Sequence, residues 1–235
     1  MVSVTRRLGV PAYAYPHTSS GYWAQLANAA PAVGMVIANP SNGPGTAADP
    51  NYVMAIQLIR SRGICLAGYV STAYGNRPLA DVLVDVRSWY DWYRIDGVFV
   101  DEVSPTEATW AYYQAIFSFI RTKDTRGRVV LNPGTQAPEQ YMEICDVLLS
   151  YEGTWTTYQN GYVENPAWVT RYSHTRFWHI VHSCPTAAAM RTTLALSRTR
   201  NAGWLFVTPG SGPNPYERLP TGRYWADELT GTAKN

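Results

Sequence analysis

Eight short apolar segments recur along the chain, and each is followed by polar residues. The segments are nearly continuous in apolar residues instead of alternating between apolar and polar positions. This pattern is typical of parallel strands that are covered on both faces of their sheet. We expect the strands at 10–16, 34–40, 63–72, 96–102, 128–134, 145–153, 176–183 and 203–210.

Helix-like stretches separate these segments, so the chain repeats a β-α unit about eight times. Such a succession predicts an α/β fold, a single (β/α)8 TIM barrel with parallel strands over residues 1–235. An open doubly wound sheet is the alternative. It is disfavoured because the first strand is not followed by a GxGxxG turn and the sequence has no GxxxxGK[ST] phosphate loop.

Two helix starts are marked by capping residues. Asp49 followed by Pro50 predicts a cap and a first-turn proline. Ser104 and Glu107 have the spacing of a capping box, with Pro105 at the first helical position.

The composition excludes several classes of partner. Lys and Arg number 19 against 17 Asp and Glu, without a basic cluster, so no nucleic-acid partner is expected. No apolar run is long enough to span a bilayer, and the first residues lack an apolar signal-peptide stretch. The protein is therefore either cytoplasmic, or its signal has been removed. Three widely separated cysteines, Cys65, Cys145 and Cys184, are expected to be buried and unpaired.

Three acidic residues lie where catalysis takes place in such a barrel, at the carboxyl ends of strands. They are Asp101, Glu102 and Glu152. Because neighbouring residues of a strand point to opposite faces, we expect Asp101 to face Glu152, with Glu102 orienting Asp101 or a sugar hydroxyl. The alternative is structural: Glu102 caps the next helix and Asp101 pairs with an arginine.

Two opposed carboxylates among many aromatic residues indicate glycoside hydrolysis. We expect Asp101 to stay ionised, as nucleophile or stabilising charge. Glu152, in more aromatic surroundings, would be the protonated general acid. The residues expected to bind the sugar lie at or just beyond strand ends: Tyr15, His17, Asn39, Tyr69, Ser71, Tyr74, Asn132, Tyr151, Trp155, His182 and Thr208.

Other chemistries fit the sequence less well. His179 and His182 are three residues apart, which on a strand places them on opposite faces, and there is no HExxH motif. No metal or cofactor is therefore expected. The two lysines, Lys123 and Lys234, lie away from strand ends, and a GxSxG elbow is absent.

An ordered set of motifs resembles the spherulin-4 family, glycoside hydrolase family 135, which is related to endo-α-1,4-galactosaminidases. The motifs are PAYAYP (11–16), VIANPSNGPG (36–45), GYVSTAYGNR (68–77), DGVFVDE (96–102), LNPG (131–134), YEG (151–153), HIVHS (179–183) and NPYERLP (214–220).

The resemblance implies a barrel that cleaves, without a metal, inside an exopolysaccharide of biofilms, a galactosaminogalactan rich in N-acetylgalactosamine. It implies that Asp101, Glu102 and Glu152 are the important acids, that anomeric configuration is retained, and that the protein is extracellular. We expect a monomer whose partner is the polysaccharide. A non-catalytic sugar-binding barrel and a hydrolase of a different microbial polysaccharide remain the alternatives.

Overall fold

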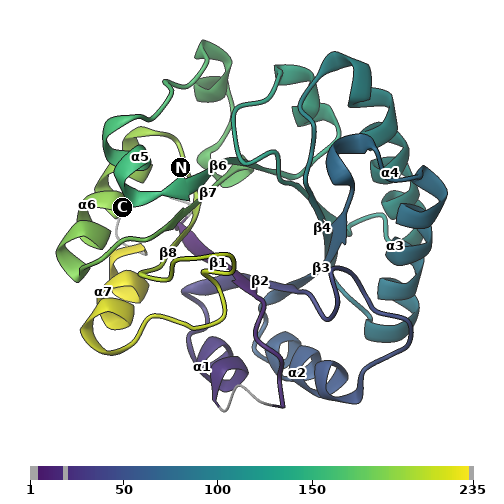
Figure 1. Cartoon of the computed structure of the whole chain (residues 1–235), viewed down its shortest axis with the longest axis horizontal. Coiled ribbons are helices and arrows are strands. Elements are labelled where there is room, and N and C mark those ends of the chain that lie inside the picture. Colours follow the sequence, from purple (N-terminus) through teal and green to yellow (C-terminus); the bar gives the residue numbers. More distant parts are fainter. Residues whose placement is uncertain (1–4, 18–20, 233–235) are drawn as a thin grey trace.

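The computed structural model of the protein describes residues 5–17 and 21–232 (Figure 1). Eight parallel strands close into a barrel in which each strand pairs with its neighbours in chain order, and β1 pairs with β8. The strands are β1 (Arg7–Ala12), β2 (Val33–Ala38), β3 (Cys65–Ser71), β4 (Gly97–Asp101), β5 (Arg128–Leu131), β6 (Val147–Thr154), β7 (Phe177–His182) and β8 (Trp204–Val207).

The predicted (β/α)8 barrel is therefore confirmed, and each expected segment contains or overlaps one strand. β1 differs most from its expected position, because it spans residues 7–12 and was expected at 10–16. The strands are buried almost throughout, and every residue of β2 is buried. This explains why the segments are apolar without alternation.

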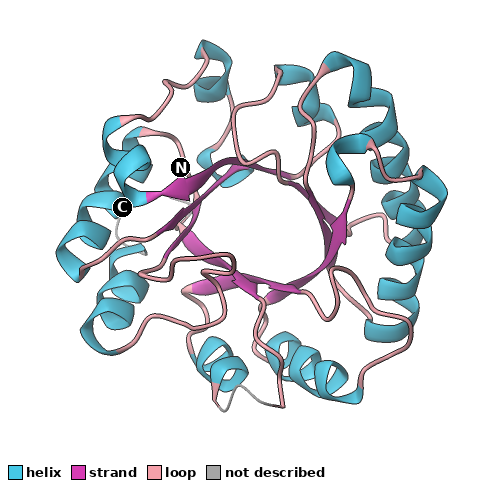
Figure 2. Cartoon of the chain, in the orientation of Figure 1, coloured by secondary structure: helices cyan, strands magenta, loops and turns pink. Residues whose placement is uncertain are grey.

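Helices surround the ring of strands on its outside, as Figure 2 shows. One position of the outer ring differs from the ideal repeat, because a 3₁₀ turn, η3 (Glu139–Glu143), replaces the helix between β5 and β6. The helices are α1 (Tyr22–Asn28), α2 (Pro50–Ser61), α3 (Leu79–Tyr93), α4 (Trp110–Lys123), α5 (Trp155–Asn160), α6 (Ala187–Thr199) and α7 (Gly222–Thr232). No helix of the described segments has both the length and the apolar character needed to cross a bilayer.

One of the two predicted helix starts is confirmed. The carboxylate of Asp49 accepts the backbone N–H groups of Asn51 and Tyr52 at 2.8 and 3.3 Å, and Pro50 is the first residue of α2. These bonds satisfy two of the donors that a helix leaves unpaired at its N-terminus.

The capping box expected at Ser104 and Glu107 is wrong. A 3₁₀ turn, η2 (Glu107–Thr109), occupies this position, and α4 begins only at Trp110. The physical reason is that Ser104 bonds elsewhere: its N–H donates to the Tyr113 hydroxyl at 2.8 Å, and its carbonyl accepts from Thr109 Oγ1 at 2.7 Å.

Aromatic rings fill the interior of the barrel between its two ends. Phe99 packs edge-to-face on Trp178 with ring centroids 5.7 Å apart, and on its other side it stacks with Tyr69 at 6.1 Å. Gly9 allows this packing, because a Cβ atom there would lie 2.8 Å from the Trp178 ring. The two ends of the barrel are therefore separated by packed side chains.

The three cysteines are unpaired, as predicted, although Cys65 is only half-buried.

A buried carboxyl group joins α7 to β8. Glu228 is 0% exposed, and its Oε1 accepts the backbone N–H of Val207 at 2.8 Å. Its Oε2 has no hydrogen-bond partner among the described residues. Burial raises the pKa of Glu228 to about 8, because the charged form loses its hydration.

This burial predicts a pH-dependent stability. An unfolded glutamate titrates near 4.3, so between about pH 4.3 and 8 the native state holds a proton that the unfolded state has lost, and stability falls as pH rises. Glu228→Gln cannot ionise. We expect its free energy of unfolding to exceed that of the wild type by at least about 1 kcal/mol more at pH 8 than at pH 5, measured by urea unfolding. The exposed Glu217→Gln is the control, and an equal difference at both pH values would contradict the expectation.

Candidate active site

Three polar side chains from adjacent strand ends meet at the carboxyl end of the barrel. Asp101 ends β4, Asn132 directly follows β5, and Glu152 lies in β6. The side-chain nitrogen of Asn132 donates to Asp101 Oδ1 at 2.6 Å and to Glu152 Oε2 at 2.8 Å. Asp101 and Glu152 therefore face each other across one amide, which is the pairing expected from strand alternation.

Tyrosine hydroxyls also bind both carboxylates. The Tyr216 hydroxyl donates to Glu152 Oε1 at 2.5 Å, and the Tyr69 hydroxyl donates to Asp101. Tyr13 lies between these two tyrosines, packing edge-to-face on Tyr69 and on Tyr216 with centroids 5.8 and 5.7 Å apart. Burial raises the pKa of all three phenols far above the usual value, so they remain neutral donors.

The surroundings of Asp101 raise its pKa to about 6. Burial is the main cause and the negative charge of Glu152 adds to it, while hydrogen bonds from Tyr69 and Asn132 oppose the shift. Asp101 therefore holds its proton to a higher pH than an ordinary aspartate does. Two neutral donors, Asn132 and Tyr216, bind the oxygens of Glu152.

Glu102 lies outside the bridged pair. Its backbone is left-handed, with φ of 54°, and its Oε2 accepts from Ser71 Oγ at 2.5 Å and from the Ala73 N–H at 3.1 Å. Its carbonyl accepts the N–H of Tyr74 at 2.8 Å. Glu102 therefore fixes the loop after β3. The Ser71 hydroxyl is already engaged in this hydrogen bond. The role expected for Glu102, orienting Asp101 or a sugar hydroxyl, stays a prediction.

Two further predicted residues lie at the carboxyl ends of β7 and β8, His182 as the last residue of β7 and Thr208 directly after β8. His182 ends β7 opposite Thr154, near enough to Glu152 for that charge to affect its titration. Burial lowers the pKa of His182, so the ring is neutral at pH 7. Thr208 is 1% exposed, and its hydroxyl accepts the N–H of Gly210.

Tyr151 points away from Glu152, to the outside of the barrel. Its ring packs on Tyr158 at 4.7 Å and near His179, in a cluster between β6, β7 and the outer helices. Trp155 is half-buried against the same cluster. His179 bonds Tyr158 and Ser150, and burial lowers its pKa to about 3. The opposite orientations predicted for His179 and His182 agree with these contacts.

The other predicted residues lie in the surrounding loops. Tyr15 is 39% exposed and bonds Asp49 and Asn51 at the start of α2. Asn39 accepts the N–H of Gly43 within its own loop, and His17 is exposed. Tyr74 is 60% exposed, in the loop that Glu102 holds.

Sequence reasoning missed Tyr13 and Tyr216. The apolar pattern predicts that β1 extends past Tyr15, whereas the strand ends at Ala12 and Tyr13 directly follows it. Tyr216 lies in the loop between β8 and α7, where no periodic pattern indicates its orientation. The available signal was the motif NPYERLP, which contains Tyr216.

The described residues contain no group of three or more His, Cys, Asp and Glu side chains placed to hold a metal ion. The acids at this end of the barrel are instead bound by neutral hydrogen-bond donors. Their arrangement is suited to proton transfer and to stabilising a positive charge between them.

The profile of the family described as spherulation-specific family 4 matches residues 7–230. This chain belongs to that family. The family member Spherulin-4 of Physarum polycephalum is 28% identical over 218 residues, which cover 87% of this chain and 64% of that protein. The chain thus spans less than two thirds of the length of this relative.

Solved structures support the barrel fold of this member of spherulation-specific family 4. Aspergillus clavatus Sph3, solved in complex with GalNAc, matches with a TM-score of 0.83 and 24% identity over 100% of both chains. A chitinase from Chromobacterium violaceum matches with a TM-score of 0.60 and 13% identity, over 97% of this chain and 100% of that one. A beta-galacturonidase from Eisenbergiella tayi matches with a TM-score of 0.62 and 11% identity, over 97% and 51%.

The bridged pair predicts a measurable coupling between the two acids. Glu152→Gln removes a negative charge beside Asp101, so the pKa of Asp101 should fall from about 6 toward its usual range. Carbon-13 NMR of the labelled carboxyl groups measures this titration directly. Glu107→Gln, an exposed acid after the same strand, is the control. An Asp101 pKa that is the same in the wild type and Glu152→Gln would rule out the coupling.

Proposed function

We propose that this protein is a glycoside hydrolase that cleaves inside an exopolysaccharide containing N-acetylgalactosamine or galactosamine. The observation that carries the proposal is the pair of carboxylates, Asp101 and Glu152, bridged by the amide of Asn132. Glycosidases use such a pair on either side of the scissile bond, one as acid and the other as nucleophile or base.

The spacing of the pair supports retention of anomeric configuration. The two oxygens bond one nitrogen at 2.6 and 2.8 Å, so they cannot lie farther apart than the sum of these lengths. Retaining enzymes place their carboxyl groups about 5–5.5 Å apart, whereas inverting enzymes need roughly 6.5–9.5 Å. The bridged pair leaves little room for the water that inversion requires.

The raised pKa of Asp101 favours this residue as the proton donor. A pKa of about 6 lets Asp101 carry a proton under mildly acidic conditions and give it to the leaving oxygen. Glu152, bound by Asn132 and Tyr216, then attacks the anomeric carbon or stabilises its positive charge. This assignment reverses the roles expected from sequence, because desolvation affects Asp101, whereas Tyr151 turns its ring away from Glu152.

Aromatic residues near the pair supply surfaces for the sugar. Tyr74 exposes 60% of its surface beside the loop that Glu102 holds, and the Tyr13 ring lies between Tyr69 and Tyr216. An aromatic ring at such a position packs against the C–H face of a sugar. Trp155, the first residue of α5, instead packs against the outer cluster of Tyr151 and Tyr158, so we do not assign it this role.

The similarities support the choice of sugar. The structure of Sph3 contains GalNAc, and the other neighbours described above act on glycosidic bonds by their names. Their identities to this chain lie below 25%, so the fold agrees and the substrate remains our proposal. A polymer of this kind is extracellular, and we propose that the protein acts there.

The decisive experiment measures turnover of near-isosteric variants on an N-acetylgalactosamine-rich polymer. Asp101→Asn and Glu152→Gln should each lower kcat by at least about 10³-fold, because each removes a group that acts on the reacting bond. Glu102→Gln should cost less, since Glu102 acts through the loop after β3. Glu107→Gln is the matched control and should retain the wild-type rate. A nearly silent Asp101→Asn, or a larger loss from Glu102→Gln, would contradict the assignment.

Comparing acetylated with deacetylated polymer identifies the substrate. Release of shorter chains from only one form shows whether the acetyl group is required. Polymer binding without product from either form would instead indicate the alternative of a non-catalytic carbohydrate-binding barrel.

A further inference from the structure

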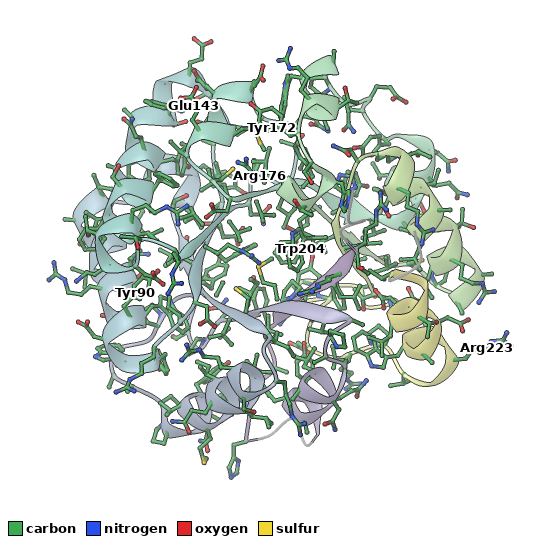
Figure 3. The ribbon with its side chains drawn as sticks, turned by 180° about the vertical axis from the view of Figure 1, so that it is seen from behind. Tyr90, Glu143, Tyr172, Arg176, Trp204 and Arg223 are labelled. Carbon is green, nitrogen blue, oxygen red and sulfur yellow. The ribbon has the colours of Figure 1, made fainter. Side chains whose placement is uncertain are left out.

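A cavity lies at the amino ends of the strands, opposite the end that carries the acid pair. Its volume is about 890 Å³, within the range of roughly 300–1,000 Å³ typical of small-molecule sites. Arg7, Cys65, Arg128, Val147 and Trp204 line it, and each is the first residue of its strand. Figure 3, the view from behind, places the labelled Trp204 near the centre of the ring of strands.

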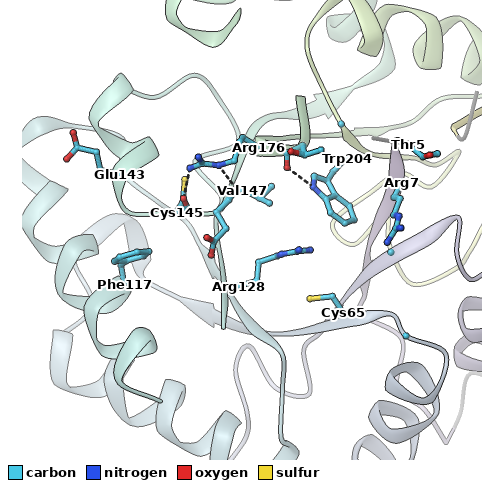
Figure 4. Close-up of a pocket in the computed structure, with 15 residues that line it drawn as sticks. Thr5, Arg7, Cys65, Phe117, Arg128, Glu143, Cys145, Val147, Arg176 and Trp204 are labelled. Atoms are coloured by element: carbon cyan, nitrogen blue, oxygen red, sulfur yellow. Dashed lines mark hydrogen bonds between the residues drawn. The ribbon is translucent and has the colours of Figure 1, made fainter. Parts of the chain in front are cut away.

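The side chains at this end are unusual for the inside of such a barrel. The interior layers are ordinarily filled by bulky branched apolar residues. Here two arginines belong to the ring of strands, Arg7 on β1 and Arg128 on β5. Their side chains point into the cavity (Figure 4).

Both arginines lie against the same indole. The Arg128 guanidinium lies over the Trp204 ring, 5.3 Å from its centroid. The Arg7 side chain and the Trp204 ring both lie against Gly34. A Cβ atom added to Gly34 would be 2.6 Å from Arg7 Cδ and 3.0 Å from the Trp204 ring. Trp204 is fixed in turn by a 2.9 Å hydrogen bond from its ring N–H to the Thr175 carbonyl. Two cationic side chains are therefore held beside one rigid ring.

Within residues 5–17 and 21–232, neither of these guanidinium groups has a hydrogen bond or an ion pair. Two acids at this end, one of which (Asp146) lines the cavity, are already paired with other arginines. Asp96 binds Arg60 at 2.8 Å, and Asp146 binds Arg121 at 2.8 Å. This leaves Arg7 and Arg128 as uncompensated charges in the cavity.

The remaining charged groups of the cavity do not neutralise them. Arg176 adds a third positive charge, and it donates to the carbonyls of Met142, Cys145 and Asp146. Glu143 is exposed, and Figure 4 shows it at the side of the cavity away from Arg7. The part of the cavity next to Trp204 is thus positive.

We propose that this cavity is a binding site for a small molecule that carries an oxyanion, a phosphate or a carboxylate group, held between Arg7 and Arg128. Guanidinium groups bind both anions through paired, charge-assisted hydrogen bonds. The apolar walls at Val147 and Phe117 accommodate the rest of the molecule. The packed rings of Phe99 and Trp178 separate this site from the acid pair, so it is independent of the proposed hydrolysis.

The test is calorimetric titration of the whole protein with inorganic pyrophosphate and, in a separate arm, with citrate. We expect saturable binding of at least one probe, weakened about tenfold or more in Arg7→Gln and in Arg128→Gln. The comparison of the two arms distinguishes a phosphate ligand from a carboxylate ligand. Arg126→Gln is the matched control, because Arg126 is exposed two residues before Arg128 and lies outside the cavity lining. Its affinity should stay within about twofold of the wild type.

A second readout locates the bound probe. Gly34 lies directly under Arg7 and Trp204, so its amide NMR signal should shift on titration in the wild type and not in Arg7→Gln. Arg7 is exposed, so Arg7→Gln tests the site even if Arg128→Gln fails to fold. Absence of saturable binding of both probes at about 10 mM would overturn the proposal, as would an equal loss of binding in Arg126→Gln.

Discussion

The side-chain amide of Asn132 donates a hydrogen bond to each of two carboxylates, and the geometry of the site depends on that arrangement. The amide is held in place at both of its ends. Its side-chain oxygen accepts the N–H of Gly134 at 2.8 Å. Its backbone N–H donates to the carbonyl of Val100 in β4, and its backbone carbonyl accepts the N–H of Val103, just after β4. Because the amide cannot turn, Asp101 and Glu152 are held close together. Two like charges at that distance in a partly dehydrated site favour a proton on one of them.

The closed barrel makes this arrangement possible. Asp101, Asn132 and Glu152 come from β4, β5 and β6, which are neighbours in the sheet, so parallel pairing alone brings the three chain segments together. The aromatic rings packed inside the barrel then separate its two ends. One end holds acids bound by neutral donors, and the other holds arginines without acid partners. The opposite charge of these two ends is the basis for assigning them different ligands.

Much of this structure could be predicted from sequence, because it depends on the periodic pattern of the strands. Continuous apolar segments indicated the barrel, and alternation placed Asp101 opposite Glu152. The same alternation would have turned Tyr151 away from the site, since it is the neighbour of Glu152. The left-handed backbone of Glu102 and the loop that carries Tyr216 have no periodic signal. The pKa of Asp101 also required the structure, because it depends on burial and on side chains distant in sequence.

The most direct test of the central claim is a crystal structure of Glu152→Gln with an N-acetylgalactosamine oligosaccharide. We predict a sugar across the Asn132 bridge, with a glycosidic oxygen about 2.6–3.2 Å from the Asp101 carboxyl group and the anomeric carbon facing residue 152. An oligosaccharide bound elsewhere on the barrel, without contact to Asp101 or residue 152, would contradict the assignment of this pair as the catalytic acids.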